Sequence, residues 1–163
     1  MPSATATISA IMSRETHSAS RIIIATPRAI FRAHIDPEVL VKWRAPHGMQ
    51  ARLHEFSARP GGGYHMELSH VDGTGQGKST ASSDIVRVRF AELIPDDRIV
   101  EEAEFQSDDP AHAGRMTITT MLAPVTGGTK VTVTAENVPA SISEEDHRKG
   151  MESSLRNLAL LLE

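Results

Sequence analysis

Residues 115–136 read RMTITTMLAPVTGGTKVTVTAE, and this segment decides the class of fold. Apolar and polar side chains alternate along both of its halves, which a Thr-Gly-Gly turn at 126–128 separates. Alternation predicts strands with one face against a core and one face in water, which is typical of antiparallel sheets. The side chains expected to face the core are those of Met116, Ile118, Thr120, Leu122, Val131 and Val133.

The same two-residue period appears in several other segments, which are bounded by Gly, Pro and Asp residues of the kind that form turns. Tyr64, Met66 and Leu68 share one face, as do Val88 and Phe90. A short β-branched run at the start of the domain also suits a strand. The strands expected are about 21–25, 49–58, 63–70, 83–93, 98–106, 115–123 and 129–136.

Three helix starts interrupt or follow these strands. Thr26-Pro27 and Asp36-Pro37 each combine a capping residue with a proline suited to the first helical position, which predicts two short helices in series. Ser143 precedes three acidic residues, and an apolar face then predicts one long helix over 143–162. This order indicates an α+β fold in which a curved sheet of about seven strands grips the long helix. A ligand cavity between sheet and helix is the natural consequence.

Composition limits the possible functions. The chain has 163 residues, no cysteine and a net charge of −4, so we expect one domain at 17–163 after a tail at 1–16. Without cysteines there are no disulfides, thiolate nucleophiles or Cys-type zinc sites. The charge balance argues against nucleic-acid binding, and no segment suits a secretory signal or a membrane span. We therefore expect a cytoplasmic protein.

Motifs for cofactors are absent from the sequence. The stretch at 73–79, GTGQGKS, misses the phosphate-loop spacing by one residue and lies between strands, so we expect a hairpin loop there. The eight histidines show no spacing typical of a metal site. The sequence thus predicts no metal and no cofactor.

Candidate proton-transfer groups are few. Glu101 shares a strand face with apolar residues, and in a dry pocket its pKa would be raised, so that it could act as a general acid or base. The alternative is an acid at the rim of an edge strand. Glu92, in register with Val88 and Phe90, has the same two interpretations, and His70 shares a face with Tyr64 at a strand end. Nucleophile motifs typical of hydrolases are missing.

Two further residues have open interpretations. Trp43 lies at a helix-to-strand junction, where it either plugs the core or forms a cavity wall. Gly150 lies inside the long helix, where it either allows a close approach or is merely tolerated.

A set of landmarks in this order resembles the SRPBCC (START-like) superfamily, and within it the homologues of the C-terminal domain of the heat-shock-protein-ninety ATPase activator. The resemblance covers about residues 18–162. The matching segments are 24–31 (IATPRAIF), 36–46, 59–64 (RPGGGY), 90–100 (FAELIPDDRIV), 127–133 and 137–139.

The resemblance implies the helix-grip fold, also called START-like or pollen-allergen-like, with an apolar cavity under the last helix. Many members of the branch carry Gly-Trp in that helix, where this chain has Gly150-Met151. Relatives in the superfamily include lipid carriers and polyketide cyclases or dehydratases, so the resemblance fixes no catalytic motif.

The first hypothesis is a protein that binds a small hydrophobic molecule and is not an enzyme. The alternatives are a cyclase or dehydratase acting in the same cavity through Glu101, Glu92 or His70, and a chaperone-associated interaction domain. A homodimer is plausible for so small a domain. The residues expected to line the cavity are Trp43, Tyr64, Met66, Val88, Phe90, Ile118, Met151 and Leu155.

Overall fold

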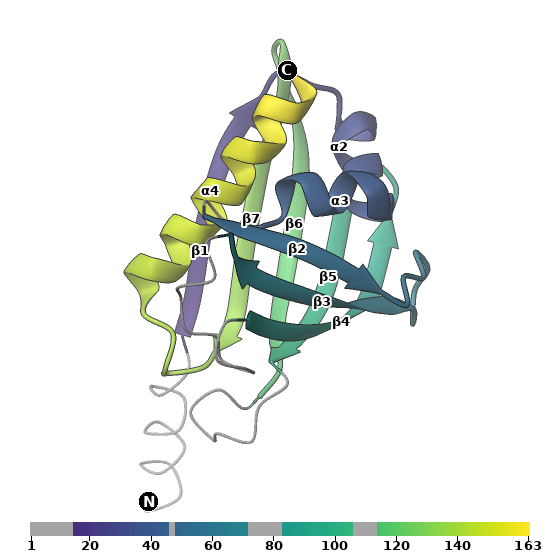
Figure 1. Ribbon diagram of the computed structural model, residues 1–163. Helices are drawn as coiled ribbons and strands as arrows, with labels where there is room; N and C mark the ends of the chain where they lie inside the picture. Colours follow the sequence, from purple (N-terminus) through teal and green to yellow (C-terminus); the bar gives the residue numbers. More distant parts are fainter. Residues whose placement is uncertain (1–14, 46–47, 72–82, 106–113) are drawn as a thin grey trace, which may run out of the picture.

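One curved antiparallel sheet and three helices make up the described part of the chain (Figure 1). In this computed structural model the described residues are 15–45, 48–71, 83–105 and 114–163. The hairpin loop expected at 73–79 lies outside them. In chain order the elements are β1 (Glu15–Ile23), α2 (Pro27–Ile35), α3 (Pro37–Trp43), β2 (Met49–His54), β3 (Gly63–His70), β4 (Ser83–Ile94), β5 (Arg98–Phe105), β6 (Met116–Val125), β7 (Gly128–Val138) and α4 (Glu144–Leu162).

The sheet has seven strands in the order β1-β7-β6-β5-β4-β3-β2. Each strand from β2 to β6 pairs with the next strand along the chain, and β1 forms the other edge of the sheet by pairing with β7. Met116, Thr120, Leu122 and Val131 are buried, as their alternation predicts. The α+β helix-grip architecture expected from the sequence is confirmed.

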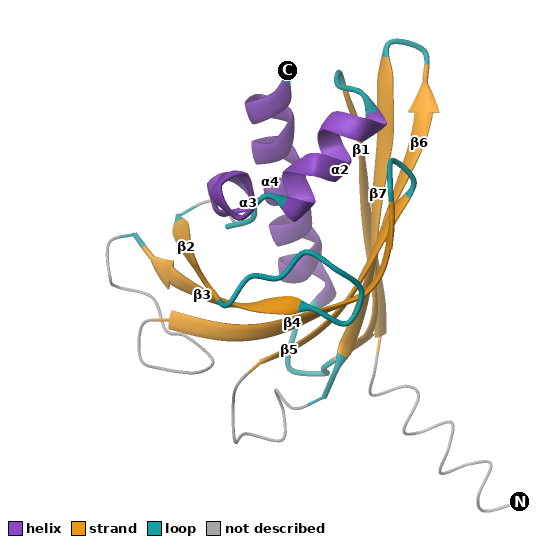
Figure 2. Ribbon diagram, turned by 90° about the vertical axis from the view of Figure 1, so that its right-hand side faces the viewer, coloured by secondary structure: helices purple, strands orange, loops and turns teal. Residues whose placement is uncertain are grey.

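The two short helices begin where their caps predict. The Thr26 hydroxyl accepts a hydrogen bond from the backbone N–H of Ala29, and an Asp36 carboxylate oxygen accepts one from Glu38. Each side chain satisfies a backbone donor that the first helical turn leaves open, and a proline follows each cap. These helices cover the end of the sheet where the chain crosses from β1 to β2 (Figure 2).

The long helix α4 lies along β1 on the inner side of the sheet (Figures 1 and 2). The Ser143 hydroxyl caps its start by accepting from the N–H of Asp146 at 3.1 Å. Leu155, Leu158 and Ala159 form its buried face. The sheet curves around a central space, and α4 and the end of α3 cover that space (Figure 2).

The first strand is longer than its sequence suggests. It begins at Glu15, within the stretch expected to be a tail, and ends at Ile23 rather than residue 25. Its inward positions at this end are His17 and Ala19, both buried. Because neither is a large apolar residue, the alternation of this strand is not visible as hydrophobic periodicity.

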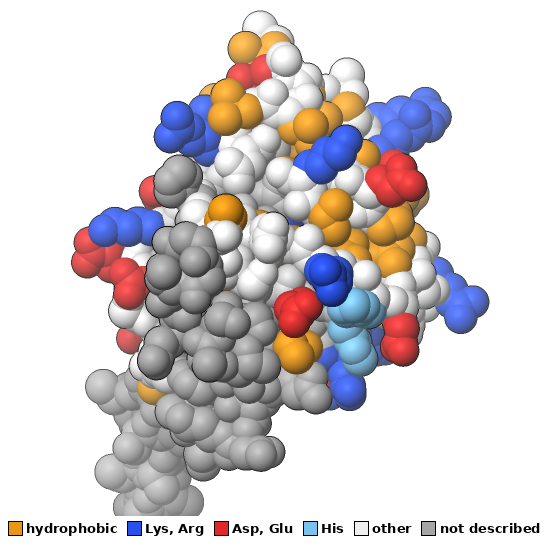
Figure 3. Space-filling model, viewed as in Figure 1, with side chains coloured by type: hydrophobic (Ala, Val, Ile, Leu, Met, Phe, Trp, Pro, Cys, Tyr) orange, Lys and Arg blue, Asp and Glu red, His pale blue; other side chains and the backbone are white. Residues whose placement is uncertain are grey.

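Charged side chains of both signs are interspersed on the surface. On the face shown in Figure 3, Lys and Arg side chains lie among Asp and Glu side chains. No helix in the described ranges has the length and apolar character needed to cross a bilayer.

Gly63 starts β3 under the carbonyl of Val88, and a Cβ at this position would overlap that oxygen. We expect Gly63→Ala to lower the free energy of unfolding by about 1–3 kcal/mol, because the backbone of β4 must shift. Urea unfolding followed by the fluorescence of Trp43, the only tryptophan, measures this change.

The matched control is Gly61→Asn. Gly61 has φ of 85° and open space around its Cβ position, and asparagine tolerates that conformation. Equal stability of the two variants would contradict a steric role for Gly63.

Candidate functional site

A cavity of about 320 Å³ lies between the inner face of the sheet and α4. This volume is at the lower end of the range typical of small-molecule sites. Its walls are largely apolar, and methionines reach it from β2, β3, β6 and α4. Of the residues predicted to line a cavity, those that do so are Trp43, Tyr64, Met66, Val88, Ile118, Met151 and Leu155.

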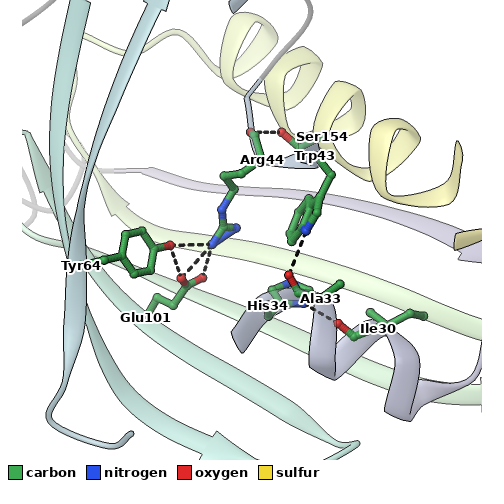
Figure 4. A network of polar contacts seen from close by, with 8 residues as sticks. All are labelled: Ile30, Ala33, His34, Trp43, Arg44, Tyr64, Glu101 and Ser154. Carbon is green, nitrogen blue, oxygen red and sulfur yellow. Dashed lines mark hydrogen bonds and ion pairs between the residues drawn. The ribbon is translucent and has the colours of Figure 1, made fainter. Parts of the chain in front are cut away.

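A charged cluster is set into this apolar wall (Figure 4). Arg44 Nη2 lies 2.7 Å from both carboxylate oxygens of Glu101 and 3.3 Å from the Tyr64 hydroxyl. The Tyr64 hydroxyl in turn donates to Glu101 Oε2 at 2.9 Å. The Glu101 side chain is 2 % exposed and that of Arg44 20 %, so the pair is largely removed from bulk water.

The cluster keeps Glu101 ionised. Burial alone would raise the pKa of Glu101, but the charge of Arg44, its hydrogen bonds and the Tyr64 hydroxyl together hold it below the usual value. Burial raises the pKa of Tyr64, and Glu101 adds to this effect against the opposing charge of Arg44. Tyr64 therefore keeps its proton and donates a hydrogen bond to the Glu101 carboxylate.

His34 and Trp43 form the neighbouring wall. The two rings meet edge to face with centroids 4.7 Å apart, and the Trp43 indole N–H donates to the carbonyl of Ala33 at 3.0 Å. His34 donates from Nδ1 to the carbonyl of Ile30. Burial, together with the charge of Arg44, lowers the pKa of His34 to about 4. The cavity wall therefore carries a neutral imidazole at physiological pH.

Side chains of α4 hold Arg44 in place. The Ser154 hydroxyl donates to the Arg44 carbonyl at 2.8 Å, and the Asn157 amide donates to the carbonyls of Trp43 and Ala45. These carbonyls belong to the C-terminal end of α3, where a helix leaves acceptors open. The last helix thus caps α3 and fixes the backbone from which Arg44 and Trp43 reach into the cavity.

Both interpretations of Trp43 apply, because its ring is 2 % exposed and also forms part of the cavity wall. Gly150 also lines the cavity. Phe90 does not line it. Its ring is fully buried behind Tyr64 at a centroid distance of 5.6 Å, so it supports the tyrosine from the core.

The other proton-transfer candidates lie away from the cavity. A bulge between Phe90 and Glu92 shifts the register of β4 against β5, after which Leu93 packs on the core. Glu92 therefore points outward, where its carboxylate lies 2.8 Å from Arg98 Nε. His70 is half-buried at the end of β3 and is not among the residues that line the cavity.

Glu101 differs from both sequence interpretations. Its strand, β5, lies inside the sheet between β4 and β6, so it is not an edge-strand acid. Its pKa is lowered rather than raised because Arg44 pairs with it. Arg44 was not among the candidates. Its position beside Trp43 at a helix end was the one sequence signal that could have pointed to it.

Comparison with known proteins identifies the family and supports the fold. Residues 24–163 match the family described as Activator of Hsp90 ATPase homolog 1-like protein. The chain belongs to this family. No curated protein matches it.

Solved structures share the fold of this family member. Protein CV1439 from Chromobacterium violaceum is 32 % identical, with a TM-score of 0.80 over 90 % of this chain and 96 % of that one. Protein Ms6760 from Mycobacterium smegmatis is 16 % identical, with a TM-score of 0.73 over 94 % and 93 % of the two chains. A protein from Arthrobacter aurescens is 15 % identical, with a TM-score of 0.75 over 93 % and 87 %.

The lowered pKa of His34 makes stability depend on pH. The histidine takes up a proton near pH 6.5 in the unfolded chain and near pH 4 in the folded chain. The contribution of His34 to the free energy of unfolding is therefore fully present above about pH 6.5 and decreases as the pH falls toward 4. We expect His34 to account for a loss of about 2 kcal/mol between about pH 7.5 and about pH 5.

The variant His34→Asn keeps a donor for the Ile30 carbonyl and should remove most of this loss, as measured by urea unfolding followed by circular dichroism. His54→Asn, which removes an exposed imidazole, is the comparison. A pH dependence that is unchanged in His34→Asn would refute the assignment.

Glu101→Gln leaves the charge of Arg44 without its carboxylate, and we expect a loss of about 3 kcal/mol in the free energy of unfolding. The double variant Arg44→Met with Glu101→Leu should recover most of this loss, because neither charge then needs a partner.

The control is Glu102→Gln. Glu102 points out of the same strand toward Arg89 and Arg115, which are more than half exposed, so its loss should cost less than about 1 kcal/mol. Similar costs for Glu101→Gln and Glu102→Gln would show that the buried cluster is not a coupled pair.

Proposed function

We propose that this protein binds a small, uncharged and mostly apolar molecule that carries one oxygen acceptor. The observation that carries this proposal is the Arg44–Glu101–Tyr64 cluster in the wall of a largely apolar cavity. The apolar walls favour a hydrophobic body, and the cluster offers a fixed polar contact at one place.

The size of the cavity limits the ligand. A volume of about 320 Å³ corresponds to roughly ten water-sized groups at ~30 Å³ each. A molecule of about that many non-hydrogen atoms would fill it. Met49, Met66, Met116 and Met151 contribute flexible side chains to the walls, which suits a ligand of irregular shape.

The charge state of the cluster favours a neutral ligand. Arg44 and Glu101 neutralise one another, and their mutual contacts use Nη2 of Arg44. The guanidinium has further N–H donors on Nη1 and Nε that take no part in these contacts. A ketone or hydroxyl oxygen could accept from them. A carboxylate would bring a second negative charge beside Glu101 without a second cation to balance it.

Proton transfer by Glu101 is not favoured by this arrangement. A general acid or base works best with a pKa near the operating pH, whereas that of Glu101 is moved in the opposite direction. We therefore place orientation of the ligand ahead of the cyclase or dehydratase alternative. The cytoplasmic location, the homodimer and the chaperone partner remain predictions from the sequence.

The test is binding of 2-decanone, which has an apolar chain of suitable length and one neutral oxygen, measured by displacement of an uncharged solvatochromic dye. We expect the ketone to bind and decanoate to bind at least about tenfold more weakly, because the buried carboxylate lacks a free cation. Preference for decanoate would contradict the proposed ligand chemistry.

The substitution Met151→Trp tests where the ligand binds. It places a larger side chain in the cavity wall and should fill much of the cavity, so we expect binding of 2-decanone to fall at least about tenfold. Leu160→Trp is the matched control, because Leu160 lies on the same helix and is 69 % exposed. Unchanged binding in Met151→Trp would show that the ligand occupies another site.

A further inference from the structure

A second cluster of polar side chains joins the start of β1 to the first turn of α4, which lie close together in Figure 1. It contains Glu15, His17, Glu144 and His147. His17 is 1 % exposed, and its Nε2 lies 2.7 Å from Glu15 Oε2. The imidazole nitrogen of His17 and the carboxylates of Glu15 and Glu144 offer ligand atoms that all lie within 4.8 Å of one another.

We propose that these three side chains form a site for a divalent transition-metal ion, with Zn²⁺ as the best fit. One imidazole and two carboxylates are ligands that Zn²⁺ accepts, and three protein ligands leave a fourth position for water. Neither the family match nor the cavity assigns such a site. Its three ligand residues are different from those of the Arg44–Glu101–Tyr64 cluster, which is the polar contact of the proposed ligand-binding function.

His147 supplies the outer contact that a metal-binding histidine requires. Its Nδ1 lies 2.8 Å from His17 Nδ1, with the two rings edge to face. Histidines that bind metals commonly use the second ring nitrogen to donate a hydrogen bond that fixes the tautomer. With the metal on His17 Nε2, the proton of His17 lies on Nδ1 and points at His147.

The local charge also favours a cation. Glu15 and Glu144 are both more than half exposed, so they can adjust to a metal between them. Arg148 Nη1 lies 3.8 Å from Glu144, beyond hydrogen-bond distance, and Arg148 is shared with Glu152. The positive end of the α4 dipole opposes a cation here, but the three acids of the first helical turn more than offset its half charge.

Occupation of this site would link β1 to the end of α4 that borders the cavity, because Asp146 and His147 line the cavity wall. The metal would thus hold the start of α4 against β1. Zn²⁺ titration of the full chain, freed of metal with a chelator and followed by calorimetry, tests the proposal. We expect one tight equivalent of Zn²⁺ and a rise in the midpoint of thermal unfolding.

The double variant Glu15→Gln with Glu144→Gln should weaken this binding at least tenfold and abolish the thermal shift. His147→Ala should weaken it by about 10–100-fold through loss of the outer contact. Glu145→Gln is the matched control, since Glu145 lies in the same helical turn and pairs with Lys149 instead. It should leave the affinity unchanged.

A second control addresses the other histidines. His54 and His65 lie directly opposite one another on β2 and β3, where a cross-strand pair could bind Zn²⁺ by itself. In the variant His54→Ala with His65→Ala the tight equivalent should persist. The proposal is overturned if the wild-type chain binds no Zn²⁺, or if binding survives the double glutamate substitution, or if it disappears with His54 and His65.

Discussion

The ion pair between Arg44 and Glu101 is the interaction around which the site is arranged. Arg44 comes from the end of α3 and Glu101 from an interior strand of the sheet, so the pair joins the helical layer to the sheet across the cavity. Removing either partner would leave a buried charge without a counter-charge, which is among the most costly single changes in a protein interior. The position of α3 over the sheet is therefore constrained by chemistry as well as by packing.

The long helix α4 holds the end of α3 in the position that the ion pair requires. Ser154 and Asn157 donate to carbonyls at the end of α3, so the backbone that carries Trp43 and Arg44 is held from the side opposite Glu101. The same helix presents Leu155 to the core and Met151 to the cavity. One helix thus closes the cavity, caps a second helix and sets the direction from which the guanidinium enters.

Much of this architecture follows from local sequence signals. The helix caps at Thr26 and Asp36 and the alternation along β6 and β7 depend on near neighbours, so they could be predicted. The outward orientation of Glu92 could not be predicted, because a bulge at residue 91 reverses which face of β4 points inward. The two-residue alternation of a sequence does not reveal such a bulge. The Arg44–Glu101 pair spans 57 positions, and no local pattern reveals a contact between residues so distant in sequence.

A buried ion pair is weak evidence for stability, because well-packed apolar side chains of similar volume often stabilise a core as much or more. Most of the remaining wall of this cavity is apolar, so apolar residues in place of Arg44 and Glu101 would leave fewer buried polar groups to satisfy. The pair instead contributes a polar cluster with no net charge, whose hydrogen-bond donors are held at one point of the wall. Such a cluster can orient a ligand by its oxygen without demanding a charge from it, and an apolar wall could not do so.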